Sequence, residues 1–159
     1  MTIEYLKSGK PDAERAEDDA KTKIVVEETL KNIEINGDAA VRELSTKFDN
    51  YSPKNFKLSE KEISDLIATL SDRELSDIKF AQEQVRNFAQ AQRDSMLDIE
   101  IETIPGVILG HKNIPVQSVG CYVPGGKFPM VASAHMSIAT ATVAGVPRIV
   151  ACTPPFEGK

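Results

Sequence analysis

The sequence predicts an α/β fold in which a helical first portion and a β-hairpin precede the opening of a doubly wound domain. Apolar residues recur at helical spacing up to about residue 93, and they alternate with acids over residues 97–102. A strand, a Gly-rich turn, a helix and a second strand follow over residues 114–152. One such unit cannot cover both faces of a parallel sheet. We therefore expect residues 1–118 to form a helical and hairpin region, and residues 119–159 to begin a second domain that is truncated.

Composition and charge exclude several classes of protein. The chain has 159 residues, 41% apolar and 27% charged, which suits one globular domain or a little more. The net charge is −5 and no basic stripe occurs, which argues against a nucleic-acid partner. No stretch approaches the ~20 apolar residues of a membrane span, and residues 1–5 lack the pattern of a signal peptide. We expect a cytoplasmic protein with no membrane partner.

Turn and capping residues divide the first fifty residues into two helices. The first is expected to start with Asp12 as its N-cap. Gly37 is expected to end that helix in a left-handed conformation, with Asp38 capping the next one. The second helix is expected to direct three apolar residues toward a core, namely Val41, Leu44 and Phe48.

Two capping boxes mark the helices that follow. Ser59 with Glu62, and Ser71 with Glu74, have the spacing at which the two side chains cap each other's backbone N–H groups. The helix after Ser71 is expected to reach about residue 93. One face of it is expected to carry Leu75, Ile78, Val85, Phe88 and Ala89.

Strands are expected from Leu97 onward. Alternation over residues 97–102 is typical of a half-buried strand, and Pro105-Gly106 of the turn of a hairpin. A second short strand is expected at 107–109, an extended segment at 114–123, a helix at 130–143 and a compact apolar strand at 148–152.

The cysteines and histidines suggest no metal centre. Cys121 and Cys152 are too far apart for a CxxC motif, and we expect both to be buried, reduced thiols. A zinc site needs three or four ligands, and no carboxylate or cysteine stands at helical spacing from His135. His111 follows a short strand without a second ligand nearby. We assign neither a metal ligand nor a catalytic acid or base in this chain.

The segment that carries most chemical information is the Gly-rich turn after the extended segment. Tyr122 leaves the strand, and Pro124, Gly125 and Gly126 lead toward a helix. Glycine lets a ligand approach the backbone, and a helix N-terminus offers free N–H groups. These residues are candidate cofactor contacts. The local pattern alone is typical of a tight turn beside a core tyrosine, and the turn is not a GxGxxG fingerprint.

Several motifs together resemble the histidinol dehydrogenase family. They are Gly120-Cys121-Tyr122-Val123-Pro124-Gly125-Gly126, Ser133 and Met136, Val143-Ala144-Gly145-Val146, Thr153-Pro154-Pro155, Gly37-Asp38-Ala39-Ala40, Lys47-Phe48-Asp49 and Val85-Arg86-Asn87-Phe88-Ala89. The resemblance covers nearly the whole chain, and its specific parts are the Tyr-Val-Pro-Gly-Gly turn and the Val-Ala-Gly-Val segment.

The resemblance implies an NAD-dependent and zinc-dependent homodimeric enzyme with incomplete Rossmann-like domains. Such an enzyme oxidises L-histidinol to L-histidine through an aldehyde, in histidine biosynthesis. It places Tyr122 at the NAD-contacting tyrosine, with Pro124, Gly125 and Gly126 in the adjoining loop. The zinc ligands and the acid–base pair of the family are expected beyond Lys159, so the 159 residues alone are expected to be inactive.

Three stretches depart from the family pattern. Ala132 and Ser133, which the resemblance places near the substrate, follow Val131 where many members have Pro-Ser-Ser. Thr142 replaces a lysine, and Lys127 opens a stretch that is usually small and neutral. These changes resemble paralogues that oxidise other small alcohols, such as sulfopropanediol. The alternatives are therefore such a paralogue, or a non-catalytic fragment that binds or dimerises.

Overall fold

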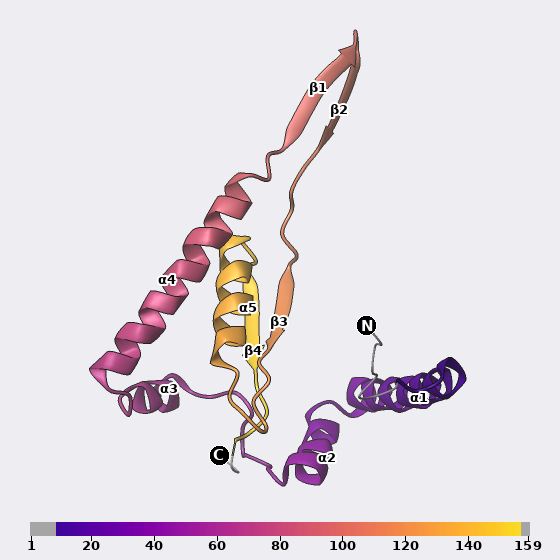
Figure 1. The fold of residues 1–159 in the computed structure, drawn as a ribbon, viewed down its shortest axis with the longest axis vertical. Coiled ribbons are helices and arrows are strands. Elements are labelled where there is room, and N and C mark those ends of the chain that lie inside the picture. Colours follow the sequence, from indigo (N-terminus) through magenta and orange to yellow (C-terminus); the bar gives the residue numbers. More distant parts are fainter. Residues whose placement is uncertain (1–8, 157–159) are drawn as a thin grey trace, which may run out of the picture. The chain divides into compact units, whose positions relative to one another are not determined.

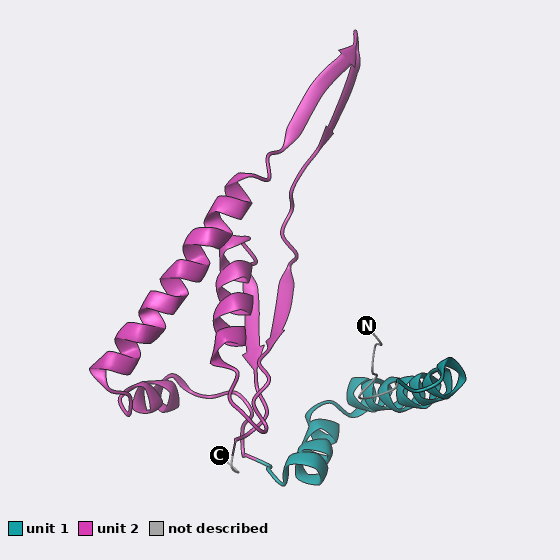
Figure 2. Ribbon diagram, viewed as in Figure 1, with its two compact units in different colours: residues 1–52 teal, residues 53–159 magenta. Residues whose placement is uncertain are grey.

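The chain folds as two compact units, residues 1–52 and residues 53–159 (Figure 2). The computed structural model describes residues 9–156, so the signal-peptide interpretation of residues 1–5 lies outside the described residues. The boundary between the two units at residue 52 is a boundary of compactness, whereas the boundary expected at residue 118 marks the start of the cofactor-binding fold. The boundary at residue 118 stays a prediction. No helix within residues 9–156 has both the length and the apolar character needed to cross a membrane.

Unit 1, residues 1–52, contains two helices joined at a glycine. They are α1 (Asp12–Asn36) and α2 (Asp38–Asp49) (Figure 1). Gly37 has the expected positive φ, +54°, although its ψ of −134° lies outside the left-handed helical region. The two predicted N-caps are wrong, because Asp12 and Asp38 are the first helical residues, and Pro11 and Gly37 occupy the cap positions. Both carboxylates instead lie at the positive ends of the helix dipoles.

Most apolar side chains of unit 1 are exposed. α1 buries none of its residues, and Leu30 is 62% exposed. α2 buries Ala40, while Val41 and Leu44 are half-buried. Phe48, which was expected in the core, is 71% exposed. Helical periodicity locates the apolar side of a helix but says nothing about which element covers it.

Unit 2, residues 53–159, begins with helices whose capping boxes are confirmed. Its described elements are α3 (Glu60–Ile67), α4 (Asp72–Asp94), β1 (Ile99–Ile104), β2 (Val107–His111), β3 (Ser118–Tyr122), α5 (Val131–Val143) and β4 (Arg148–Cys152). The N–H groups of Ser59 and Ser71 donate to the carboxylates of Glu62 and Glu74 at 2.7 and 2.8 Å, and the serine Oγ atoms accept in return at 3.3 Å. Hydrogen bonds from the serine hydroxyls, and then from these N–H groups, lower the pKa of both glutamates.

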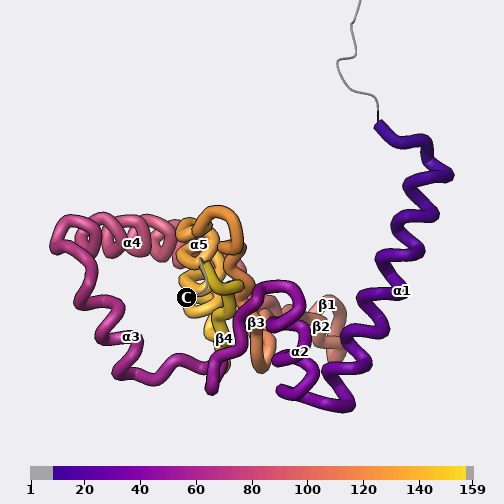
Figure 3. The backbone as a smooth tube through the Cα atoms, turned by 90° about the horizontal axis from the view of Figure 1, so that it is seen from below, coloured from indigo at the N-terminus to yellow at the C-terminus, as the bar shows by residue number. Residues whose placement is uncertain are grey.

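α4 packs along α5, and α5 contacts both strands of the β3–β4 pair (Figures 1 and 3). Ala89 of α4 and Ala139 of α5 are 7% and 6% exposed. Small side chains at a contact allow two helix axes to approach closely. Of the residues expected to share one face of α4, Leu75 is half-buried, whereas Phe88 is 68% exposed. Phe88 directly precedes Ala89, so its side chain points roughly 100° away around the helix.

β1 and β2 form the predicted antiparallel hairpin, and Gly106 in its turn has φ +83°. A β-bulge between Glu102 and Ile104 shifts the register, so that Ile104 pairs with Val107. The apolar side chains that share one face are therefore Ile99, Ile101, Ile104, Val107 and Leu109. Each of these is at least 40% exposed, so the expectation of a half-buried strand is wrong.

Hydrogen bonds hold together the two chain segments at the base of the hairpin. The backbone N–H of Asn113 donates to Asp98 Oδ1 at 2.9 Å, and Asn113 Nδ2 donates to the same oxygen at 3.2 Å. These two bonds, the backbone one first, lower the pKa of Asp98. His111 Nε2 lies 3.1 Å from the carbonyl oxygen of Leu97 and must donate its proton there, because a carbonyl only accepts.

β3 and β4 run parallel on either side of α5 in the chain, which confirms the predicted strand–turn–helix–strand unit. Their register runs from Ser118 opposite Arg148 to Tyr122 opposite Cys152. This alternation places Val119, Cys121, Ile149 and Ala151 on the face toward α5; the first three are buried or half-buried, and Ala151 is exposed.

Candidate cofactor site

Two loops meet at the carboxyl ends of β3 and β4 (Figure 1). The N–H of Val123 donates to the carbonyl of Cys152 at 2.8 Å, which continues the parallel ladder beyond β3. The N–H of Met130 donates to the carbonyl of Pro124 at 3.0 Å and closes residues 124–130, here called the cofactor loop. Ligands of open parallel sheets bind outside the carboxyl ends of the strands. This end of the β3–β4 pair is therefore the candidate site.

Gly125 of the cofactor loop is buried against the residues that follow β4. A Cβ atom at this position would lie 2.7 Å from Thr153 Oγ1 and 3.8 Å from Pro154 Cδ. The first distance is far shorter than an ordinary van der Waals contact, and the second is ordinary. Gly126 has more room, since its Cβ would lie 3.9 Å from Pro154 Cγ. The two loops therefore lie closely against each other at Gly125.

The face of the β3–β4 pair that points away from α5 is open, and we call it the bare face. It carries Gly120, Tyr122, Val150 and Cys152, all of them exposed. Tyr122 is 62% exposed, and a Cβ atom on Gly120 would meet nothing within 4 Å. Tyr122 is therefore not packed in a core within the described residues. An exposed aromatic ring at this place is a candidate for stacking on a flat ligand.

The two residues expected near the substrate lie in the first turn of α5. Ala132 is exposed and Ser133 is half-buried. The N–H of Ser133 donates to the carbonyl of Met130 at 2.9 Å, and no side chain caps the helix at Met130. The first turn of a helix carries a partial positive charge. Ala132 and Ser133 thus follow the cofactor loop directly, and Lys127 within that loop is exposed.

The two cysteines lie on opposite faces of the β3–β4 pair. Cys121 is opposite Ala151 and is 4% exposed, whereas Cys152 is opposite Tyr122 and is exposed. Side chains alternate along a strand, so the two sulfur atoms point away from each other. The expectation of two buried thiols is confirmed for Cys121 and wrong for Cys152. Both cysteines are free.

The part of the chain that the structure describes gathers no ligand set for a metal. Within residues 9–156, no group of three or more His, Cys, Asp or Glu side chains is placed to hold a metal ion. His111 lies at the base of the hairpin, and His135 is half-buried in α5. The residues described here do not fit zinc, and we derive no chemical step from a metal.

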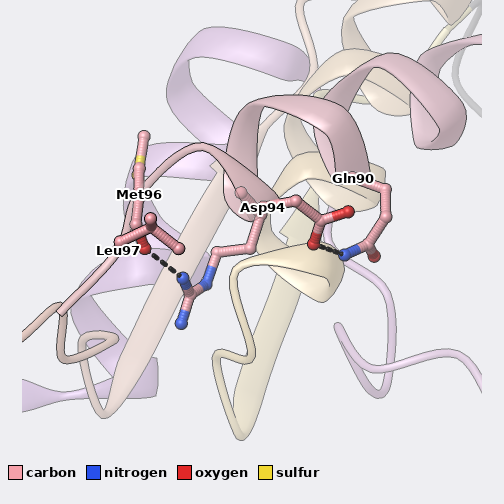
Figure 4. A pocket seen from close by; sticks show the side chains of 5 residues that line it. Gln90, Asp94, Met96 and Leu97 are labelled. Atoms are coloured by element: carbon pink, nitrogen blue, oxygen red, sulfur yellow. Dashed lines mark hydrogen bonds between the residues drawn. The ribbon is translucent and has the colours of Figure 1, made fainter.

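A shallow depression lies at the C-terminal end of α4, at the opposite end of α5 from the cofactor loop (Figures 1 and 4). Its polar groups are engaged with each other and with the backbone. Gln90 Nε2 donates to Asp94 at 2.7 Å, and Arg93 donates to the carbonyl of Met96 at 3.1 Å. Leu97 completes the lining. Nothing in the depression is arranged for catalysis.

Two residues of the site were not predicted from the sequence. Thr153 contacts the cofactor loop, and Gly120 opens the bare face beside Tyr122. A hydroxyl residue directly after a parallel strand, and a glycine inside a short strand, were the available signals. Neither signal reveals which partner the residue meets, because that depends on the pairing of strands about thirty residues apart.

The sequence profile of the histidinol dehydrogenase family matches residues 12–159, nearly the whole chain. The chain belongs to the histidinol dehydrogenase family. The crystal structure of histidinol dehydrogenase from Elizabethkingia anophelis matches 97% of the chain with a TM-score of 0.78 and 26% sequence identity. This match confirms the predicted α/β fold class, with helices and a partial α/β domain.

Curated members of the histidinol dehydrogenase family include relatives with different names. A histidinol dehydrogenase homolog from Shouchella clausii is 54% identical over 98% of this chain. The sulfopropanediol 3-dehydrogenase of Ruegeria pomeroyi is 42% identical over 99%, and the histidinol dehydrogenase of Methanosarcina mazei is 37% identical over 82%. The chain spans only 37%, 36% and 30% of the lengths of these three proteins.

Proposed function

We propose that this chain supplies the cofactor-side wall of an NAD-dependent dehydrogenase that oxidises a small alcohol. The observation that carries the proposal is the exposed ring of Tyr122, at the carboxyl end of one of two parallel strands and beside a closed Gly-rich loop. NAD would accept a hydride from the alcohol carbon. Tyr122 would stack on the flat part of the cofactor, with Pro124, Gly125 and Gly126 forming the adjoining loop.

The remaining parts of the enzyme are proposed to lie outside these residues. The zinc ligands and the acid–base pair that the family resemblance implies would come from further along the polypeptide. Within residues 9–156, no group of three or more His, Cys, Asp or Glu side chains is placed to hold a metal ion. The complete enzyme would be a homodimer in the cytoplasm. Membership of the histidinol dehydrogenase family supports these proposals.

Histidinol is the first proposed substrate, since the family takes its name from that activity. A sulfonated diol is the second, and two observations favour it. Identity is higher to the sulfopropanediol 3-dehydrogenase than to the histidinol dehydrogenase of Methanosarcina mazei. Ala132 is exposed in the first turn of α5, and the exposed cation of Lys127 would suit an anionic substrate.

Reduction of NAD by a full-length hybrid tests the proposal. In this hybrid, the chain is joined to the remaining part of the Shouchella clausii relative, which is 54% identical to it. Base–aromatic stacking contributes about 1–3 kcal/mol, so Tyr122→Ala should raise KM for NAD about 5-fold to 150-fold. Tyr122→Phe should restore most of that loss, because the ring is kept. Tyr51→Phe in unit 1 is the matched control.

Two results would count against the proposal. A hybrid that binds no NADH would remove the cofactor function, and a Tyr122→Ala hybrid with unchanged KM would remove Tyr122 from the site. Separate assays with histidinol and with sulfopropanediol decide the substrate. Turnover of the sulfonate alone would point to Ala132 and Lys127 as specificity residues, which Ala132→Ser and Lys127→Ala would then test.

A further inference from the structure

The glycine at position 125 has a steric neighbour on the other loop of the site. Gly125 is buried, and the φ angle there is not positive, so its backbone conformation is open to any residue. The nearest obstacle to a side chain is the exposed Thr153, whose Oγ1 lies 2.7 Å from the place a Cβ would take, so that one of the two residues must shift. The next nearest atom, Pro154 Cδ, is at an ordinary 3.8 Å. One oxygen atom therefore accounts for the close contact.

The hydroxyl of Thr153 makes no hydrogen bond to the cofactor loop within the described residues, so the two are related only by lying side by side. Its Oγ1 donates within its own turn, to the carbonyl of Pro154 at 3.3 Å, a long bond. The ladder bond from Val123 to Cys152 ends one residue before Thr153. Thr153 thus follows β4 directly and lies beside the cofactor loop, which follows β3.

We propose that Thr153 is a positioning residue that fixes the cofactor loop by filling the space beside Gly125. This role rests on the proposed function, because the loop positions Tyr122 and the adjoining backbone for NAD. Gly125 is a glycine because Thr153 stands against it, and not because the cofactor must reach the backbone there. The effect of a side chain at position 125 should therefore depend on which residue occupies position 153.

A rescue experiment tests this dependence. In the full-length hybrid, Gly125→Ala should lower the unfolding midpoint and weaken NADH binding about tenfold, the size expected for overpacking. Adding Thr153→Ala should restore both, because it removes Oγ1. Adding Thr153→Val should restore neither, because Val keeps the bulk and loses only the hydroxyl. Gly126→Ala is the control for stability, since its Cβ meets only an ordinary contact at 3.9 Å.

The kinetic readout separates positioning from a general loss of fold. Gly125→Ala should raise KM for NAD far more than it lowers kcat, and combining it with Thr153→Ala should return KM toward the starting value. Failure of this double variant to recover would overturn the proposal and leave ligand approach as the reason for Gly125. Recovery of the unfolding midpoint without recovery of KM would remove the link to the cofactor.

The same series keeps the two proposals distinguishable. A hybrid that binds no NADH contradicts the proposed function, whereas the unfolding midpoints are measured without nucleotide and still decide the contact between residues 125 and 153. An unfolding midpoint that Gly125→Ala leaves unchanged contradicts the contact itself, whatever the hybrid binds.

Discussion

Gly110→Ala should weaken the hairpin, and Gly120→Ala should not, although both glycines lie within strands. A Cβ at position 110 would lie 2.2 Å from the carbonyl oxygen of Ile99, whereas a Cβ at position 120 would meet nothing within 4 Å. The first distance is about 0.8 Å short of the 3.0 Å that real Cβ atoms keep. The atom in the way belongs to the backbone, so β1 and β2 must move apart to admit a methyl group.

The two substitutions are expected to change stability in opposite directions. Overpacking of this kind costs about 1–3 kcal/mol. Replacing glycine by alanine at an unstrained position instead stabilises by about 0.4–1 kcal/mol, because the unfolded chain loses freedom. Opening of the hairpin in Gly110→Ala should therefore be about 5-fold to 150-fold more frequent than in the parent chain.

Native-state hydrogen exchange of the full-length hybrid measures this opening amide by amide. Exchange of the β1 and β2 amides should accelerate in Gly110→Ala, while the amides of α4 keep their rates. In Gly120→Ala, the hairpin amides should exchange as in the parent chain. Equal hairpin exchange in all three proteins would show that the close contact between residue 110 and Ile99 does not exist.

Three further predictions concern single side chains, and one concerns the whole chain. A thiol reagent should modify Cys152 rapidly and Cys121 only on unfolding, and equal rates would contradict their placement on opposite faces. The pKa of Asp98 in the folded chain lies below its ordinary value, so the hydrogen bonds at the base of the hairpin should persist at neutral pH and weaken only as pH falls through that lowered pKa. An NMR titration that follows the amide of Asn113 reports this weakening. In Asp98→Asn, the pH dependence of the Asn113 amide should disappear. Ser71→Ala should cost about 1 kcal/mol of stability in urea unfolding, and a midpoint equal to that of the parent would show that the capping box contributes nothing. The exposed apolar faces predict that the isolated chain self-associates, and a clean monomer in size-exclusion chromatography would refute this.

Local signals in the sequence were sufficient for much of the fold. The capping boxes at Ser59 and Ser71 were predicted because both partners of each box lie within one turn. The strand at Arg148–Cys152 was predicted within its observed bounds from a short apolar run that ends before two prolines. The N-caps assigned to Asp12 and Asp38 were wrong by one position, since a carboxylate serves either at the cap or in the first turn.

Burial was predicted less well than secondary structure. Phe48 and Cys152 were expected inside and are exposed, and Phe88, expected on one face with Ala89, is exposed as well. A periodic pattern identifies an apolar face without identifying its cover. The contact between Gly125 and Thr153 was out of reach for a similar reason. It depends on the register of β3 and β4, and no residue near either position specifies that register.

The parallel pairing of β3 with β4 also determines when β3 can find its partner strand during synthesis. Ser118 pairs with Arg148, so β3 has no partner strand until thirty further residues have been made. At the pace of protein synthesis, about 5–20 residues per second, that interval is roughly 2–6 s. The hairpin before it closes within about 1–10 μs once both of its strands exist. The edge of β3 in a nascent chain therefore stays without its partner strand for about a million times longer than the hairpin takes to form.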